Sequence, residues 1–446
     1  MHRQEFGKLL RLAIPLSLAQ LAHYTVSFVD TLMVGSLGTE ALAGIAIGST
    51  TFYFVFSIVS GIIYAISPMV SHAVGAEDHE SVPDIVRHGC WFGLIFSIPP
   101  LLLFWNIAPV LTWLGQDTNV VQESSGYLRA ISFGIIPALM TVSLRGFLEG
   151  TGKTRPILVV AGLAIALNVF FNYAFMFGHF GLPRLGLVGT GVASSIVYSM
   201  LLFIVVAYIR LTQHVRYPIF QQLFTFNSAT LAELFRIGLP ITMTIAFENG
   251  LFAASAFAMG IIDPQQLAAH QIALQSAAVT FMVALGIALA TCVRVGQFAG
   301  ASDLNGARVA GQVGMLTATG VMVVPAIVFA AFPAFIIGLY VDQTQEDISV
   351  LFHHSITFLR IAALFQIADG LQVAASNALR GLKETKAAMY LTLLAYWAIG
   401  APACVFLAFG LKLEGRGLWF GLTIGLAAAA LMLTIRFVNH FRAARH

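Results

Sequence analysis

Long uncharged segments alternate with short polar segments along most of the chain. Eight segments contain no Asp, Glu, Lys or Arg: residues 41–76, 89–116, 156–183, 185–209, 264–293, 309–341, 387–411 and 417–435. A helix that crosses the hydrocarbon core of a bilayer needs about 20 mainly apolar residues. Each of these segments is long enough or nearly so, and the pattern therefore predicts membrane-spanning α-helices.

Tolerating a few polar residues in the other segments gives twelve predicted spans. They are residues 11–36, 44–70, 89–113, 127–147, 156–179, 186–210, 233–261, 267–293, 309–336, 352–379, 387–410 and 416–437. The sequence thus predicts an all-α integral membrane protein with twelve transmembrane helices.

The basic residues are distributed unevenly between the two sides of the predicted bundle. If the helices alternate from an N-terminus on the inside, five basic residues fall outside, namely Arg129, Arg184, Arg360, Lys412 and Arg416. The other 18 of the 23 Lys and Arg residues fall inside. An excess of this kind in short loops marks the cytoplasmic side of a membrane protein. We therefore expect both termini to be cytoplasmic.

The composition supports a membrane protein and excludes several other classes. Of the 446 residues, 58% are hydrophobic and 10% are charged, and the net charge is +3. Soluble domains carry about 25% charged residues, and a nucleic-acid-binding surface needs a larger positive charge. The chain has no phosphate-binding G-x-x-x-x-G-K-[ST] loop, no hydrolase signature and no clustered metal ligands. We therefore expect a protein that is not an enzyme and that needs no cofactor and no nucleic acid.

The first half of the chain aligns with the second at a shift of 225 residues. The aligned pairs include Arg11 and Arg236, Pro15 and Pro240, Gly35 and Gly260, Gly75 and Gly300, and Asp78 and Asp303. Chance similarity between apolar helices is the alternative, but these pairs include charged, Gly and Pro positions. The shift covers an even number of helices, so both copies have the same topology and are related by an axis along the membrane normal. We predict two homologous six-helix bundles, at 1–210 and 232–446, joined by a linker at 211–231.

Three acidic residues fall well inside the predicted spans: Asp30, Glu248 and Asp369. A charged group near the bilayer centre costs several kcal/mol, so such residues usually face a cavity and mark an ion or substrate path. The alternative is a neutral, hydrogen-bonded acid that fixes helix packing. No intramembrane Lys or Arg is evident beside them, which favours the ion-path interpretation.

Further polar residues share helix faces with these acids or lie on neighbouring spans. Asn168 and Asn172 are four residues apart, so they lie on one helix face and could hold Asp30; simple helix-to-helix hydrogen bonding is the alternative. Glu248 and Asp369 could share one proton or one Na+ ion, because two close carboxylates raise each other's proton affinity.

Three residues are weaker candidates for lining a cavity: Gln271, Gln275 and His23. The two glutamines share a helix face, but packing between helices is the simpler interpretation of both. His23 and the similarly isolated His270 are typical of residues that contact a neighbouring helix.

Several of these segments resemble the multidrug and toxic compound extrusion (MATE) transporters. Similar segments are Phe28–Ala43, Arg145–Pro156 and Arg294–Asp303, and the contexts of Glu248 and Asp369 are similar to the NorM-type branch. The resemblance implies two bundles that form a V and an antiport of cationic, amphipathic compounds against Na+ or H+. It also implies that Asp30, Asn168 and Asn172 form an N-lobe polar site, and that Glu248 and Asp369 form a C-lobe cation site. Some members have Asp at the position of Asn172, so their proton-coupled arrangement is not fully reproduced.

We therefore expect an antiporter in the bacterial inner (plasma) membrane that is coupled to Na+ or H+ and exports small organic cations by alternating access. The lipid bilayer is its only other expected partner, because no obligate protein partner is evident. A flippase for a lipid-linked saccharide or another lipid is the alternative, although an anionic head group would favour Lys or Arg inside the spans. A channel or receptor is a third class, which the duplicated halves disfavour.

Overall fold

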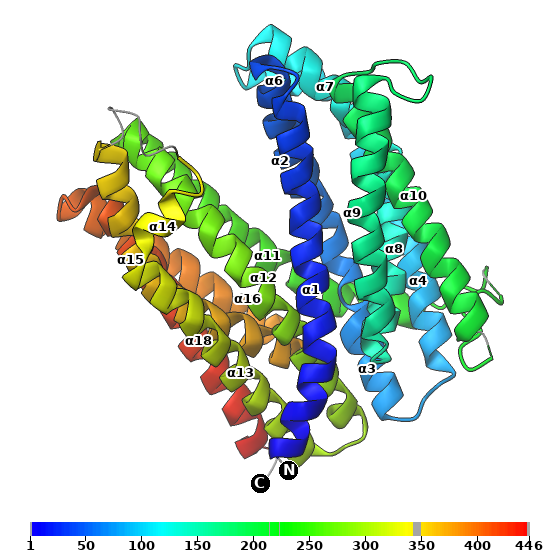
Figure 1. Ribbon diagram of the computed structural model, residues 1–446. Coiled ribbons are helices and arrows are strands. Elements are labelled where there is room, and N and C mark those ends of the chain that lie inside the picture. The colour runs from blue at the N-terminus through cyan, green and yellow to red at the C-terminus, as the bar shows by residue number, and fades with distance from the viewer. Residues whose placement is uncertain (1, 214, 223, 342–348, 444–446) are drawn as a thin grey trace. The chain divides into compact units, whose positions relative to one another are not determined.

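The computed structural model describes residues 2–213, 215–222, 224–341 and 349–443. Residues 214 and 223 of the predicted linker, and 342–348 and 444–446 of the second predicted bundle, lie outside this part. Within the described ranges all regular elements are helical and none is a strand, as Figure 1 shows. The predicted all-α class is confirmed.

The membrane-spanning candidates correspond one to one with the twelve predicted spans. Eleven helices, among the residues that the structure describes, are long and apolar enough to cross a membrane, and a bent pair gives a twelfth. That pair is α7 (Thr118–Ser132) and α8 (Ile135–Gly150), which meet at 52°. The bend lies at Gly134, where a Cβ would approach the Cα of Ser195 to 2.9 Å, so glycine allows the bend to pack closely on its neighbour.

The described chain divides into two compact units. One unit is Leu18–Thr242, and the other combines the chain up to Ser17 with the chain from Met243 onward. The two division points are 225 residues apart, from 17 to 242, which is the shift of the sequence repeat. Both fall inside long helices, α1 (His2–Gly35) and α11 (Ser228–Ile262). This division of the chain does not test the predicted bundle limits at residues 210 and 232, which stay a prediction.

The Leu18–Thr242 unit contains both long and short helices. Besides parts of α1 and α11, and besides α7 and α8, it contains α2 (Thr39–Ile63), α3 (Ile66–Gly75), α4 (Ser81–Phe96), α5 (Ile98–Trp105), α6 (Ile107–Trp113), α9 (Thr154–Phe177) and α10 (Leu187–Thr212). Helix α10 packs against α7, α8 and α9, and its course beside α9 is visible in Figure 1. A small residue also brings α8 close to α3, since a Cβ at Gly150 would lie 2.7 Å from the Val70 side chain.

The unit from Met243 onward is built around α15. Its helices are α12 (Pro264–Gly300), α13 (Leu304–Ala331), α14 (Pro333–Ile337), α15 (Ser349–Gly381), α16 (Thr385–Leu393), α17 (Ala401–Val405) and α18 (Glu414–Ala443), with π-helical turns at Leu394–Gly400 and Phe406–Gly410. Helix α15 contacts α12, α13 and α18, so it is enclosed on several sides. Because α15 carries Asp369, this enclosure places an acid in the interior of the unit.

The repeat is also visible in backbone geometry. Glu77 and Ser302, which the 225-residue shift aligns, both have left-handed backbone angles, with φ of 58° and 59°. The same hydrogen bonds surround them: the N–H groups of Asp78 and Asp303 donate to carbonyl groups five residues earlier, each at 2.9 Å. The second span of each half therefore ends in the same turn.

A buried ion pair fixes the start of α1. Both carboxylate oxygens of Glu5 accept hydrogen bonds from Arg294 on α12, at 2.6 and 2.8 Å. The Arg294 guanidinium also lies over the Phe298 ring, 4.7 Å from its centroid. This pair attaches the first turns of α1 to the unit that begins at Met243, although they are far from it in sequence.

Replacing Glu5 should destabilise this attachment. Breaking one side of a buried pair typically costs about 3–5 kcal/mol, because the other charge stays buried. We expect Glu5→Gln to lower the thermal unfolding midpoint in detergent clearly. The control is Glu40→Gln, because Glu40 is exposed and only accepts a hydrogen bond from Asn119. Equal midpoints for the two variants would show that the pair does not hold α1.

Candidate functional site

Asp30 on α1 is enclosed by two asparagine amides from α9. Its side chain is 6% exposed, and its Oδ1 atom accepts hydrogen bonds from Asn168 Nδ2 at 2.9 Å and Asn172 Nδ2 at 2.6 Å. The four-residue spacing of the asparagines places both amides on one face of the helix, and Asn172 Nδ2 also donates to Asn168 Oδ1 at 3.2 Å. The structure thus brings all three predicted residues of this site together.

Three tyrosines surround the Asp30 site, and the sequence reasoning missed them. Tyr53, Tyr127 and Tyr198 come from α2, α7 and α10, and each interacts electrostatically with Asp30. The Tyr53 hydroxyl also forms side-chain hydrogen bonds with Ser27 and Tyr198. The sequence signal for these tyrosines was their position inside predicted spans, because a phenol hydroxyl within a membrane needs a polar partner.

Glu248 and Asp369 form a second acidic site, in the unit that begins at Met243. Asp369 on α15 is 5% exposed, whereas Glu248 on α11 is partly buried, and the two carboxyl groups interact electrostatically. Tyr396 interacts with both acids, and its buried hydroxyl has no hydrogen-bond partner in the described protein. The sequence predicted the two acids but not this tyrosine.

Two features of this second site were not predicted from the sequence. Arg380, just beyond the predicted span 352–379, interacts electrostatically with Glu248, so a basic residue at the end of α15 influences this acid from outside the span. Tyr396 lies in the π-helical turn Leu394–Gly400, where Trp397 Nε1 donates to the Phe247 carbonyl oxygen at 3.2 Å. Single π-helical turns often occur at functional positions because they rotate side chains out of the regular helical order.

The weaker candidates lie apart from these contacts. His23, Gln271 and Gln275 have exposed side chains within their units, so they stay predictions for a cavity lining. His270 is fully buried with its ring 5.5 Å from the Trp419 ring, which fits a helix-contact residue.

The two acids and Tyr396 of the second site offer oxygen atoms. Two carboxylates and a phenol oxygen are hard ligands of the kind that bind hard cations, and the same carboxylates can hold a proton. No group of three or more His, Cys, Asp or Glu residues that could hold a metal ion occurs in the described ranges. The two carboxylates and the phenol oxygen could hold a small hard cation or a proton.

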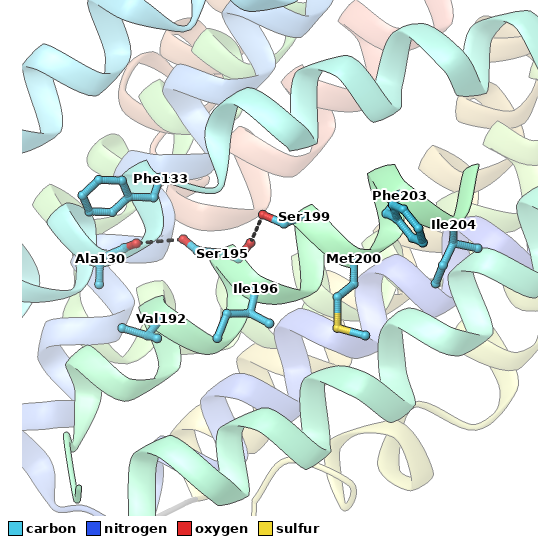
Figure 2. A pocket seen from close by; sticks show the side chains of 9 residues that line it. All are labelled: Ala130, Phe133, Val192, Ser195, Ile196, Ser199, Met200, Phe203 and Ile204. Atoms are coloured by element: carbon cyan, nitrogen blue, oxygen red, sulfur yellow. Dashed lines mark hydrogen bonds between the residues drawn. The ribbon is translucent and has the colours of Figure 1, made fainter. Parts of the chain in front are cut away.

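An apolar recess on the Leu18–Thr242 unit is a separate feature. Figure 2 shows it along α10, with a volume of about 590 Å³ and with Phe133 and Phe203 at its edge. Its two hydroxyl groups, on Ser195 and Ser199, donate to the carbonyl oxygens of Ala130 and Ser195 at 2.7 and 2.8 Å. None of its nine lining residues is ionisable, so the recess holds none of the acids.

Comparison with known proteins gives matches along nearly the whole chain. Residues 15–174 and 240–406 match the MatE family. The chain is 36% identical to the Probable multidrug resistance protein NorM of Pseudomonas putida over 97% of this chain and 94% of that protein. It is 37% identical to the protein of the same name from Agrobacterium fabrum, over 97% and 93%.

Solved structures show the same fold. The eukaryotic MATE transporter AtDTX14 superposes with a TM-score of 0.86 at 24% identity, over 100% of this chain and 99% of that chain. An outward-facing multidrug resistance MATE family transporter superposes with a TM-score of 0.91 at 19% identity, over 99% and 97%. The sequence matches over most of the length, together with this fold, show that the chain belongs to the MatE family.

Proposed function

We propose that this protein exports cationic, amphipathic compounds in exchange for Na+ or H+. The observation that carries the proposal is the pair of acidic sites buried within spans, Asp30 in one unit and Glu248 with Asp369 in the other. Both relatives named above are designated multidrug resistance proteins, which supports drug export as the activity. The acids supply negative charge where lipid would otherwise oppose a cation.

The two sites would serve the exchange in different ways. Asp30 accepts two amide hydrogen bonds, a set that stabilises the charged carboxylate yet also tolerates a proton on the free oxygen. Glu248 and Asp369 repel each other when both are ionised, so the pair favours one bound cation or one shared proton. Substrate and coupling ion would compete for these carboxylates, and alternating access would expose them to one side at a time.

The energy for such an exchange depends on how many charges move. An exchange of one monovalent organic cation for one Na+ or H+ moves no net charge, so each tenfold gradient of the coupling ion supplies about 1.4 kcal/mol. Each additional charge that moves inward gains about 2.3 kcal/mol per 100 mV, which would maintain a gradient of more than about tenfold. We also propose cytoplasmic termini, from the 18 basic residues on the inner side, and a location in the bacterial inner membrane.

Removing an acid should abolish the coupling. We expect Glu248→Gln and Asp369→Asn to reduce the ion-driven ethidium gradient by more than about tenfold, because a neutral side chain no longer exchanges a charge. The measurement is ethidium movement in proteoliposomes under separately imposed Na+ and proton gradients. The gradient that drives transport identifies the coupling ion.

The exposed Glu40→Gln variant is the control and should transport like the unchanged protein. Normal transport by both acid variants would contradict the coupling role. If neither gradient moves ethidium, but a fluorescent lipid crosses the bilayer, the protein is a flippase.

Asn172→Asp should make transport strongly pH-dependent. The amide nitrogen is 2.6 Å from the Asp30 carboxylate, so the new carboxyl group fits only while one of the two groups carries a proton. We expect near-normal efflux at low pH, where the protonated carboxyl donates as the amide does, and loss of efflux as the pH rises. Asn172→Leu removes the donor at every pH and should be impaired throughout. Identical pH profiles for the two variants would show that this hydrogen bond does not serve transport.

A further inference from the structure

Buried polar atoms without a partner are concentrated along α15. Four residues of this helix, Ser355, Gln366, Gln372 and Ser376, each have a side-chain oxygen that is buried and accepts or donates no hydrogen bond within the described protein. All four side chains are almost fully buried. Buried polar groups in native proteins nearly always have a partner, in the protein or in ordered water.

These oxygens lie on one side of the helix, together with Asp369. At 100° per residue, the five positions fall within roughly a third of the helical circumference. The opposite side, which carries Arg360 and Leu364, is exposed. Ser355 and Ser376 are 21 positions apart, which is about 32 Å of helix and close to the hydrocarbon thickness of about 30 Å.

Neighbouring helical segments add two more unpartnered atoms. Tyr396, which interacts with Asp369, and Thr392, about one turn earlier, both have buried hydroxyl oxygens without a partner. Gln366 Nε2 donates to Thr280 Oγ1 on α12 at 2.5 Å, so its amide is held while its oxygen is left unpaired. Asp369 is thus flanked by oxygen atoms on both sides along the helix axis.

The outer half of the row is closed by aromatic rings. The Trp419 ring lies 6.3 Å from the Phe358 ring and 5.8 Å from the Phe365 ring, between the level of Ser355 and that of Gln366. His270 is 5.5 Å from Trp419. Oxygen atoms are therefore closely spaced only from Gln366 toward the Arg380 end, and a continuous pore through the unit is blocked.

We propose that the polar row from Asp369 to Ser376 binds a file of water molecules that connects Asp369 with the Arg380 end of α15. Through this file Asp369 exchanges its coupling cation with one membrane face inside the unit. In the proton form, Asp369 gives its proton to the adjacent water, which becomes hydronium, and the carboxylate remains. In the sodium form, the hydroxyl and amide oxygens replace part of the hydration shell of the ion. This inference rests on the proposed coupling role of Asp369.

The chemistry of the row favours this occupant. The unpartnered atoms beside Asp369 are all hydroxyl or amide oxygens, which accept hydrogen bonds from water and also coordinate a hard cation. Dry, unpartnered oxygens would destabilise the fold, so removing one would stabilise it. Oxygens that bind water have the opposite effect, because removing them leaves the water without its partner.

The kinetic test compares two matched double variants. Ser376→Ala with Thr392→Val removes one hydroxyl of the row and the unpartnered hydroxyl about one turn before Tyr396. Ser276→Ala with Thr291→Val removes two buried hydroxyls of the same unit that already have partners. They donate to Ile272 and Ile287 of their own helix, each at 2.8 Å, and Ser276 also contacts the Tyr340 hydroxyl at 3.2 Å. We expect the first variant to slow ion-driven efflux by about tenfold or more, without a change in ethidium affinity, because proton transfer is impaired. The control variant should keep the unchanged rate.

A second measurement detects the water without transport. Brief X-ray radiolysis produces hydroxyl radicals from bound water, and these oxidise the nearest side chains. We expect oxidation of the buried Tyr396 in the unchanged protein, a clear decrease in the Ser376→Ala, Thr392→Val variant, and no decrease in the control. The buried Phe437 of the same unit, which packs on Gly311, should stay unmodified.

The outcomes separate this inference from the proposed function. Two results would overturn the water file. One is that Tyr396 reacts as little as Phe437; the other is that the Ser376→Ala, Thr392→Val variant unfolds at a higher midpoint and keeps its rate of efflux. Absence of ion-driven efflux in the unchanged protein would instead refute the coupling role, whereas the labelling of Tyr396 would still report the water. Separate Na+ and proton gradients show which hydrated cation uses the file.

Discussion

The structure depends on the cost of holding ionisable groups away from water. Lipid penalises Asp30, Glu248 and Asp369 wherever they lack polar neighbours, so each acid must have a polar shell built from other helices. For Asp30 the shell is two asparagine amides from α9 with three tyrosines nearby. For Asp369 it is the interior of a unit in which α15 is surrounded by α12, α13 and α18. The packing of the helices supplies these polar shells.

The two halves of the repeat meet this requirement differently. The shared framework is strict, since the turns at Glu77 and Ser302 have the same backbone conformation and the unit divisions differ by 225 residues. The acids do not follow the repeat. The position equivalent to Asp30 is Ser255, whose hydroxyl donates to the Phe252 carbonyl oxygen of its own helix. Duplication therefore preserved the scaffold, while each half acquired its own charged site.

The two acidic sites also differ in how many of their buried polar atoms have hydrogen-bond partners. Asp30 Oδ1 accepts two direct amide hydrogen bonds, and beside it Asn172 Oδ1 is buried without a protein partner. Around Asp369 many buried oxygens lack a protein partner, as expected where water or an ion completes the coordination. Part of this difference comes from the π-helical turn at Leu394–Gly400. This turn changes the direction of the side chains that follow and places Tyr396 near the acids.

The sequence by itself determined the helices, their number, the repeat and the three intramembrane acids. These follow from local composition, since apolar length and isolated charges are readable residue by residue. The Asn168 and Asn172 pair was also predictable, because a spacing of four fixes a shared helix face. Only the tertiary structure decided which residues meet across helices: the tyrosines near Asp30, Arg380 beside Glu248, Glu5 on Arg294, and the unpaired row of α15. Such contacts depend on how helices distant in sequence rotate and pack, and a uniformly apolar sequence carries little information about that rotation.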